Sequence, residues 1–441
     1  MSIVARAMRE SVGRSIANKD PPAEQTEKLG SFPGKNSCED CASTARSEGL
    51  LGGPRMKKLF VLVTSACLIG AAAPANYNAF GVAVVQRLAA NSRNSNVFVS
   101  PVSLGVGLAM VADGAAGSTR ASLLRGLRFT GPNLARANAS LVTSLKSNHD
   151  ASVGLADAVW LRSDLPPRPQ YVSLLRHSYD ARARAVHFGD PSAVAAINNW
   201  TRKHTLGLID HLLYRTKPTD FAILTNALAF EGNWSIPFRH DATGFEPFTD
   251  SSGARHLVPM MSRSGWFQTV DEASFRAVRI PYGRGGYAAY FLLPTRGTVG
   301  ALVRSLSAST IDHIARIERP ERLAVELPRF TATYAPRLND VLKGLGMGMM
   351  FSERADFSPM HAPPPGLRIA SVVHNAFVRV DEGGTVAAAA TAVVVRTKLA
   401  LIMLGSRVRT FFVDRAFVFA IRDERTGTLL FVGVVRTLPP A

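Results

Sequence analysis

Few residues in this sequence have the types and spacing that catalysis or metal binding requires. Cys38 and Cys41 form a CxxC pair, but neither a second pair nor a nearby histidine accompanies it, so it is weak evidence for zinc or redox chemistry. The tract Met347-Gly-Met-Met350 has no His or Cys partner close in sequence and predicts adaptable packing rather than a metal site. His374 lies in a mostly apolar segment, which is more typical of a hydrogen-bonded core histidine than of a general base.

The short motifs of the common enzyme classes are also missing. G-x-S-x-G, H-E-x-x-H and G-x-x-x-x-G-K do not occur, and no G-x-G-x-x-G lies between a strand and a helix. We therefore predict that the protein is not an enzyme and that it has no cofactor and no metal site.

A segment of small residues near the C-terminus is the most unusual feature of the sequence. It begins at Asp381, and the residues 387–392 within it carry no side chain long enough to clash with a neighbouring strand. Its apolar part is shorter than the roughly 20 residues that a bilayer requires. Its β-branched residues favour an extended chain over a helix. An ordinary buried strand is the alternative, but Arg396 and Lys398 follow, and a protease could cut at either side chain.

The residues just before this segment predict a strand that leads into it. Apolar and larger or polar side chains alternate from Ala376 to Asp381, which is the period of a half-buried strand. The small residues would continue this strand after a Glu-Gly-Gly break. The string from His374 to Ala392, HNAFVRVDEGGTVAAAATA, closely resembles the hinge of the serpins, which are proteinase inhibitors that work by conformational change.

The resemblance implies a fold and an extent. Serpin landmarks spread from about Asn76 to Pro439, and the chain has no internal repeat. We therefore expect the α+β serpin fold, a single domain with three β-sheets, about eight to nine helices and an exposed reactive-centre loop.

The resemblance also assigns site residues. In the hinge, Gly383 and Gly384 are expected to permit the chain to reverse, and alternate small side chains are expected to turn toward the core. In the sheet, the asparagine matching Asn226 bonds the histidine matching His374 in serpins. Ser100 matches a serine beneath the sheet, although a plain helix cap explains it equally well. The hinge comprises Glu382, Gly383, Gly384, Thr385, Ala387, Ala388, Ala389, Ala390 and Thr391, and the shutter and breach residues are Ser100, Ser103, Asn226, Trp234 and His374.

The mechanism implied by the family is a trap. A serine protease attacks the loop and forms an acyl-enzyme, and the cut loop then inserts into the central sheet and holds the protease in a covalent complex. Family spacing from Glu382 places the reactive bond at Lys398–Leu399, which fits a trypsin-like protease. The loop is several residues longer than usual on its C-terminal side, so the alternative cleaved residues are Leu399, Leu401, Met403 and Arg407.

Two functional alternatives stay open. The protein could inhibit a chymotrypsin-like, subtilisin-like or cysteine protease, or it could be a non-inhibitory serpin that acts as a binding or chaperone-like protein. The small, uncharged residues of the hinge favour the inhibitory class.

The elements that must position these residues can be read from local patterns. Helical spacing of apolar residues predicts a helix over 76–90, and Ser100-Pro101 is a start signal for an apolar, buried helix over 102–112. The apolar run 221–230 predicts a strand covered on both faces. Further predicted elements are a strand over 96–99, a helix over 120–127, a strand over 154–161 and a buried hairpin formed by 417–421 and 428–435.

The N-terminal region has the layout of a leader. From Met56, two lysines, an apolar stretch and Ala71-Ala72-Ala73 form the pattern of a signal peptide. We therefore expect residues 1–55 to be an over-long gene prediction or a disordered extension, 56–75 a signal peptide and 76–441 the serpin domain. A signal-anchor is the alternative. The mature protein is expected to be secreted, to the extracellular space or the periplasm, and its body contains no cysteine.

The chain is strongly basic, with a net charge of +18 at pH 7. Its arginines are scattered singly rather than gathered with aromatic residues, so we interpret the charge as a solvated surface and expect no nucleic-acid partner. A polyanion cofactor is the alternative. The expected partner is the target serine protease, and we expect a monomer without a stable membrane span.

Overall fold

The computed structural model describes residues 75–317, 320–362, 366–385 and 409–440, which belong to one compact unit, Leu68–Ala441. The CxxC pair, residues 1–55, nearly all of the predicted signal peptide, the hinge residues 387–391 and the predicted reactive bond Lys398–Leu399 lie outside the described residues. No helix within the described ranges is both long and apolar enough to cross a membrane.

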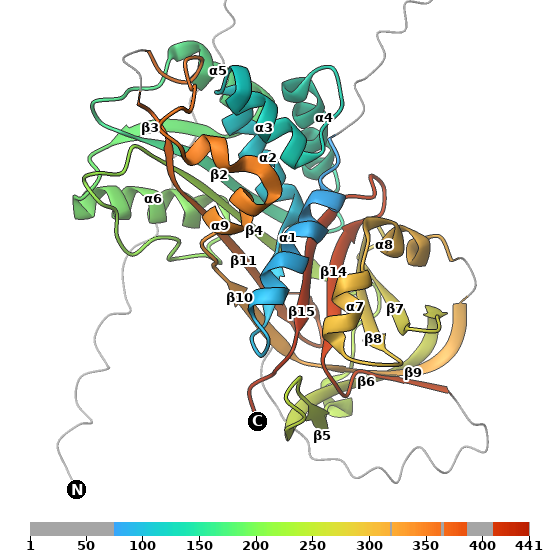
Figure 1. The fold of residues 1–441 in the computed structure, drawn as a ribbon. Helices are drawn as coiled ribbons and strands as arrows, with labels where there is room; N and C mark the ends of the chain where they lie inside the picture. Colours follow the sequence, from blue (N-terminus) through green and yellow to red (C-terminus); the bar gives the residue numbers. More distant parts are fainter. Residues whose placement is uncertain (1–74, 318–319, 363–365, 386–408, 441) are drawn as a thin grey trace, which may run out of the picture. The chain divides into compact units, whose positions relative to one another are not determined.

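A six-stranded mixed sheet, here called the central sheet, runs through one half of the unit (Figure 1). Its apolar strand β4 has buried side chains on both faces, as the sequence predicts. β4 pairs with β2 antiparallel and with β11 parallel. In order across the sheet the strands are β10 (Phe330–Tyr334), β11 (Ile369–Val380), β12 (Gly384–Thr385), β4 (Ala222–Asn233), β2 (Ser152–Arg162) and β3 (Arg182–Val186).

The remaining described strands form one nine-stranded sheet. The resemblance implied three sheets, but the described residues form two, because the 17-residue strand β6 pairs with β5 along its first part, with β9 along its middle and with β7 at its end. The α+β class is confirmed. The strands are β1 (Val97–Val99), β15 (Leu429–Val435), β14 (Phe417–Asp423), β8 (Tyr287–Pro294), β7 (Phe275–Tyr282), β6 (Arg255–Asp271), β9 (Pro320–Pro328) and β13 (Arg409–Phe412), with β5 (Gly244–Thr249) beside β6.

Nine α-helices occur within the described ranges, in agreement with the expected eight to nine. They are α1 (Asn78–Asn91), α2 (Pro101–Asp113), α3 (Gly117–Leu127), α4 (Leu134–Lys146), α5 (Pro169–Tyr179), α6 (Pro191–His204), α7 (Val299–Ser305), α8 (Ala308–Ala315) and α9 (Asn339–Leu342). Short 3-10 and π turns cover His240–Ala242 and Lys343–Phe351, and in the second of these Met347 and Met350 are buried core residues, as predicted.

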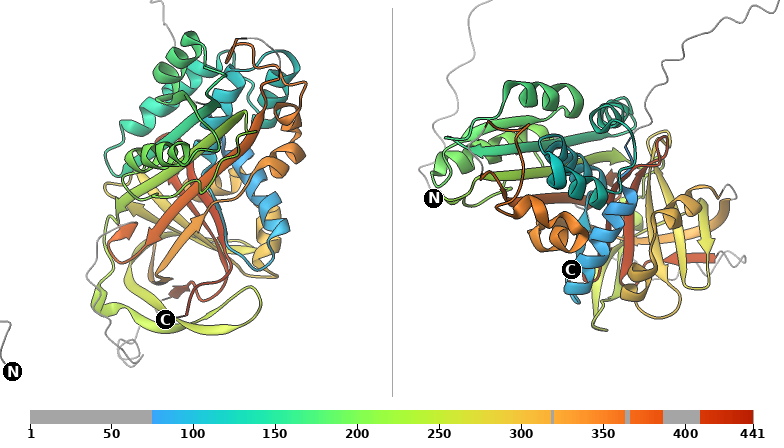
Figure 2. Two further views of the ribbon diagram at one scale, coloured as in Figure 1. Left: turned by 90° about the vertical axis from the view of Figure 1, so that its left-hand side faces the viewer. Right: turned by 45° about the horizontal axis from the view of Figure 1, so that its top comes forward.

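Helices cover both faces of the central sheet (Figure 2). Ile223 and Ala227 of β4 pack with Ile197 and Trp200 of α6 in one apolar cluster. Alternate residues of β4, such as Leu228, belong to the main core together with α2. Because successive side chains of a strand point to opposite faces, α6 and α2 lie on opposite sides of the sheet.

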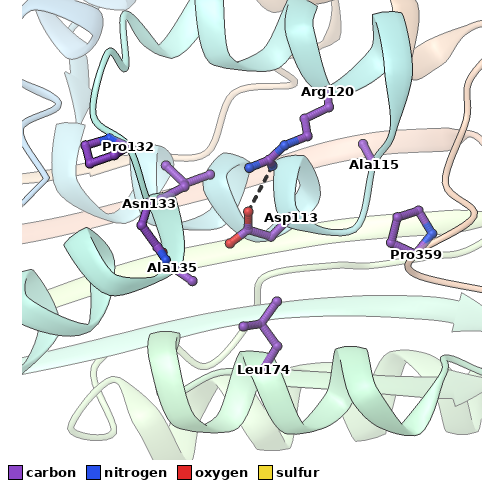
Figure 3. A pocket seen from close by; sticks show the side chains of 9 residues that line it. Asp113, Ala115, Arg120, Pro132, Asn133, Ala135, Leu174 and Pro359 are labelled. Carbon is purple, nitrogen blue, oxygen red and sulfur yellow. Dashed lines mark hydrogen bonds and ion pairs between the residues drawn. The ribbon is translucent and has the colours of Figure 1, made fainter.

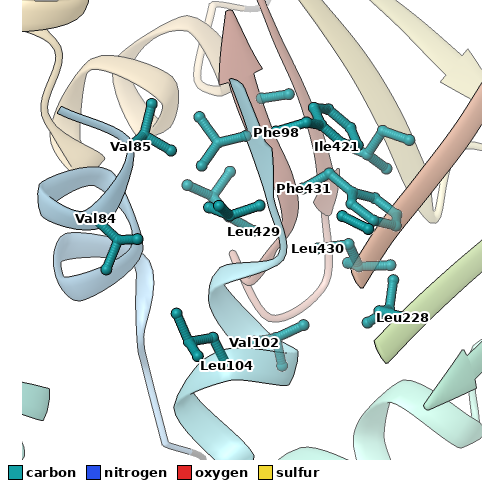
Figure 4. Packing of buried hydrophobic residues seen from close by; sticks show 14 of the residues in the cluster. Val84, Val85, Phe98, Val102, Leu104, Leu228, Ile421, Leu429, Leu430 and Phe431 are labelled. Atoms are coloured by element: carbon teal, nitrogen blue, oxygen red, sulfur yellow. The ribbon is translucent and has the colours of Figure 1, made fainter. Parts of the chain in front are cut away.

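The main core joins the N-terminal and C-terminal parts of the chain. Figure 4 shows Val84 of α1 and Val102 of α2 near Phe98 of β1 and the C-terminal hairpin β14–β15. Phe98 stacks on Phe431 with ring centroids 5.1 Å apart. The predicted hairpin is confirmed, with Phe417 opposite Val435.

Helix α2 is the most deeply buried helix that bears on the site. All its residues from Pro101 to Ala112 are buried, as its all-round apolar sequence predicts. The Ser100 hydroxyl accepts a hydrogen bond from the backbone N–H of Ser103, so Ser100 is the helix cap. Two glycines of α2 allow close packing in different ways. A Cβ atom at Gly105 would lie 2.1 Å from Cγ of Tyr77, whereas the nearest atom to a Cβ at Gly107 would be Cβ of Asn226, 3.4 Å away.

These two glycines form a matched pair for a stability test. Gly105→Ala is expected to lower the free energy of unfolding by about 1–3 kcal/mol, because Tyr77 and α2 must move apart. Gly107→Ala is expected to change the free energy of unfolding by less than about 1 kcal/mol, since it makes ordinary contacts and favours the helix. Urea-induced unfolding measures both values, and an equal loss in the two variants would contradict the packing described for α2.

Candidate functional site

The seam between β11 and β4 is the feature around which the predicted site residues gather. The two strands pair directly from Ile369 opposite Ala222 to Phe377 opposite Ala229. Beyond this point β12 lies between them, with Thr385 opposite both Gly232 of β4 and Val380 of β11. The start of the small-residue segment is therefore already a strand inside the sheet. This two-residue strand, here called the wedge, separates β11 from β4 at one end of the seam.

A tight turn brings the chain from β11 back into the sheet. The Asp381 side chain accepts hydrogen bonds from the N–H groups of Gly383 at 3.0 Å and Gly384 at 3.2 Å. Only Gly384 has a positive φ, +155°, and a Cβ atom there would lie 2.1 Å from the carbonyl oxygen of Gly232. From the sequence, both glycines are expected to permit the reversal, but only Gly384 has a backbone conformation that requires glycine.

Trp234 holds this turn from the end of β4. Its backbone N–H donates to the Gly383 carbonyl and its indole N–H to the Asp381 carbonyl, both at 2.9 Å. Its ring stacks on Tyr282 with centroids 4.4 Å apart, and the Tyr282 hydroxyl lies 2.6 Å from Oγ1 of Thr385. The structure thus brings Trp234 and the hinge together, and it adds Tyr282, which the sequence analysis did not select.

Glu382 anchors the hinge through its side chain, which is fully buried. The carboxylate accepts hydrogen bonds from the Thr243 hydroxyl at 2.6 Å and from the Arg329 guanidinium, and Nδ1 of His240 lies 3.6 Å away. Burial alone would raise the pKa of this carboxyl, but the hydrogen bonds from Arg329 and Thr243 lower the pKa below its usual value. These three partners are distant in sequence, and the sequence analysis missed them.

A buried polar cluster lies beneath the seam. The Ser100 backbone N–H donates to Nε2 of His374 at 3.0 Å, so the proton of the neutral ring resides on Nδ1, which donates to Oδ1 of Asn226. Burial lowers the pKa of His374 to about 3, so the imidazole is neutral near pH 7. The structure thus brings together Ser100, Asn226 and His374, and Ser100 serves both as the helix cap and as a partner of the sheet.

Ser103 leads to a residue that the sequence analysis missed. Its hydroxyl donates to Oδ1 of Asp157 at 3.4 Å, and Asp157 lies directly opposite Asn226 in the pairing of β2 with β4. Asp157 is only 2% exposed, and burial raises the pKa of its carboxyl well above the usual value. The available signal was a lone acidic residue between two alanines in the strand predicted over 154–161.

A cavity of about 420 Å³ lies away from the seam, between the end of α2 and helices α3, α4 and α5 (Figure 3). Its one carboxylate, Asp113, is bound by Arg120 at 2.9 Å and by the Tyr179 hydroxyl at 2.5 Å. This carboxylate is therefore committed to structural partners. In the part of the chain that the structure describes, no cluster of three or more His, Cys, Asp or Glu residues could hold a metal ion.

Comparison with known proteins agrees with this geometry. The family model described as Serpin (serine protease inhibitor) matches residues 75–438. The chain is 34% identical to an uncharacterized serpin-like protein from Thermococcus kodakarensis over 81% of this chain and 83% of that protein. It is 30% identical to the glia-derived nexin of Mus musculus, over 80% and 91% of the two chains. A crystal structure of native protease nexin-1 with heparin superposes with a TM-score of 0.74 at 26% identity, and the match covers 82% of this chain and 98% of that one.

The buried histidine predicts a stability loss in acid. The folded pKa of His374, about 3, is below the value of roughly 6.5 for an unfolded imidazole, so the unfolded chain binds more protons between these pH values. This group is therefore expected to remove about 1.4 kcal/mol from the free energy of unfolding for each pH unit below about 6. Denaturant unfolding at pH 4.5–7 should show a shallower acid slope in His374→Gln than in the wild type.

The control is His177→Gln, because His177 is exposed on α5. This variant is expected to keep the wild-type acid slope. If His374→Gln kept it as well, His374 would not be the neutral buried group described above.

Proposed function

The chain belongs to the serpin family, and we propose that it is a secreted inhibitor that traps a trypsin-like serine protease when its loop is cut and inserted into the central sheet. The observation that carries this proposal is the position of Gly384 and Thr385 as a strand between β11 and β4. The layout of residues 56–75 supports the secretion part of the proposal.

The observed register indicates which residues would follow into the seam. Gly384 lies opposite Asn233 and Thr385 opposite Gly232, so continuing the antiparallel ladder places Thr391 opposite Asn226 and Val395 opposite Ala222. On the other side, the pairing of Thr385 with Val380 places Thr391 opposite His374. Insertion would therefore separate His374 from Asn226 and set a hydroxyl-bearing residue between them. β4 has 12 residues, and the segment 384–395 would pair with all of them.

The length of β4 also bears on the reactive bond. A strand that fills the seam would end at Val395, so a cut before this residue would leave the new strand incomplete. Lys398 lies beyond this limit, so the bond Lys398–Leu399 and a trypsin-like target are compatible with it. The alternatives Leu399, Leu401, Met403 and Arg407 also lie beyond it, and the mass of the cleaved fragment must distinguish them.

The driving force would come from completing the sheet. About ten new backbone hydrogen bonds at about 1 kcal/mol each, together with burial of alternate side chains, would release on the order of 10 kcal/mol. This is comparable with the stability of an ordinary domain. A free-energy release of this size is sufficient to distort an attached protease before water completes the hydrolysis of the acyl-enzyme.

Trypsin provides the direct test. We expect intact protein and trypsin to form an SDS-stable complex. The C-terminal fragment that is released should have the mass of a peptide that begins at Leu399. Lys398→Glu should abolish the complex with trypsin, because the specificity pocket then meets a like charge. Clean cleavage without an adduct, across trypsin, chymotrypsin and subtilisin, would favour the non-inhibitory class instead.

The direction of the hinge side chains gives a second test with a matched control. Continuing the register places Ala387 between Phe230 and Val378, which are both fully buried, and Val386 beside the exposed Glu231. Ala387→Arg would bury an unpaired charge, so trypsin is expected to cleave it with about tenfold less complex per cleavage. Val386→Arg should form complex almost as the wild type does. Equal behaviour of the two variants on SDS gels would contradict this register.

A further inference from the structure

Helix α2 is bound to both sides of the seam. On one side, the Ser100 N–H donates to His374 of β11 at 3.0 Å. On the other side, the Ser103 hydroxyl donates to Asp157 of β2 at 3.4 Å. The helix therefore connects the two parts of the central sheet that a new strand would have to separate.

Opening the seam moves these parts relative to each other. Neighbouring strands lie about 4.8 Å apart, so admitting a strand between β11 and β4 requires a shift of that size. β2 must move with β4, because the two strands pair continuously from Ser152 opposite Glu231 to Leu161 opposite Ala222. Asp157 consequently shifts together with Asn226. If α2 stays with β11, Asp157 moves away from Ser103; if α2 moves with β2, Ser100 moves away from His374.

The surroundings of Asp157 provide no counter-ion. Its Oδ2 atom and the Nδ2 atom of Asn226 have no hydrogen-bond partner within the described ranges. The groups that face it are Ser103 and Gly107 of α2, the Tyr77 phenol, and Asn226 with His374 behind it. Ser103, Gly107 and Asn226 have no ionisable side chain, and burial keeps the other two uncharged, since it raises the pKa of Tyr77 and lowers the pKa of His374. The hydrogen bond from Ser103 favours the carboxylate, but it is long, and burial has the larger effect on the pKa of Asp157.

We propose that Asp157 is a positioning residue whose proton keeps the seam closed, so that loss of this proton promotes opening of the central sheet. This inference rests on the proposed function in that opening is the step which insertion requires. The ionised carboxylate is poorly solvated in the closed sheet, and opening brings water to Asn226, its direct neighbour across the ladder. The closed form thus binds more protons than the open form. The free-energy difference that favours the closed form therefore decreases as the pH rises toward the raised pKa of Asp157.

The test measures opening directly, without a protease. The probe is a synthetic peptide with the sequence of residues 386–395, VAAAATAVVV, because Gly384 and Thr385 already occupy the first two positions of the seam; it is added to the intact protein between pH 5.5 and 8.5. We expect the wild-type rate of peptide uptake to rise with pH over this range, because the closed form holds the proton of Asp157 more tightly than the open form does. Asp157→Asn should take up peptide slowly and without pH dependence. Infrared absorption of a protonated carboxyl group should be present in the wild type and absent from this variant.

The control for removing a carboxylate is Asp180→Asn, because Asp180 is exposed and paired with Lys146 at the surface. It should keep the wild-type pH dependence. If Asp157→Asn does not fold, Ser103→Ala tests the same contact. Because the lost hydrogen bond favours the carboxylate, this variant should keep the proton to higher pH and take up peptide more slowly than the wild type at the upper end of the range, and an unchanged pH dependence would overturn the inference. A pH-independent wild-type rate, or a pH slope retained in Asp157→Asn, would overturn it too. Uptake by none of the proteins would overturn the proposed insertion as well.

Discussion

The pairing between β11 and β4 is complete along most of its length and interrupted at one end, and the other parts of the site depend on this interruption. Below Phe377 the two strands satisfy each other's backbone groups directly. Above it, Gly384 and Thr385 lie between them, and Trp234, Tyr282 and the buried Glu382 hold the turn in place. Because buried backbone groups need partners, a wedge of two residues defines both where a longer strand would enter and which register it would take.

Below the wedge, a row of buried polar side chains crosses the seam in addition to the apolar clusters on the two faces of the sheet. His374, Asn226 and Asp157 form a row across three adjacent strands, and α2 contacts the two ends of this row. A hydrogen bond between neutral groups contributes little net stability and can be exchanged for another, whereas separating an apolar interface costs free energy in proportion to its area. The polar row is therefore the part of the seam that the proposed insertion would exchange most readily. Its two titratable members respond to pH in opposite directions, since burial favours neutral His374 and neutral Asp157.

Local signals in the sequence predict the elements well, and long-range contacts explain what they miss. The Ser100-Pro101 start of α2, the apolar run of β4 and the C-terminal hairpin each depend on neighbouring residues, and the structure contains all three. The union of two expected sheets through β6 depends on partners far along the chain. The contacts of Glu382 with Thr243 and of Ser103 with Asp157 join residues 139 and 54 positions apart. Sequence periodicity does not indicate such pairs. For the pair of Ser103 with Asp157, the local signal was a lone aspartate in an apolar strand.

Helix α6 packs against both sides of the seam. Its cluster with the outer face of the central sheet includes Ile223 of β4 and Val373 of β11, which lie on opposite sides of the seam. Under the proposed insertion, a strand that advances beyond the wedge would enter the part of the seam that α6 covers, so the contacts of α6 with these residues would have to loosen and form again. Its cluster is separate from the main core, which allows such a detour without melting the rest of the molecule. The contacts of α6 would therefore slow the proposed insertion.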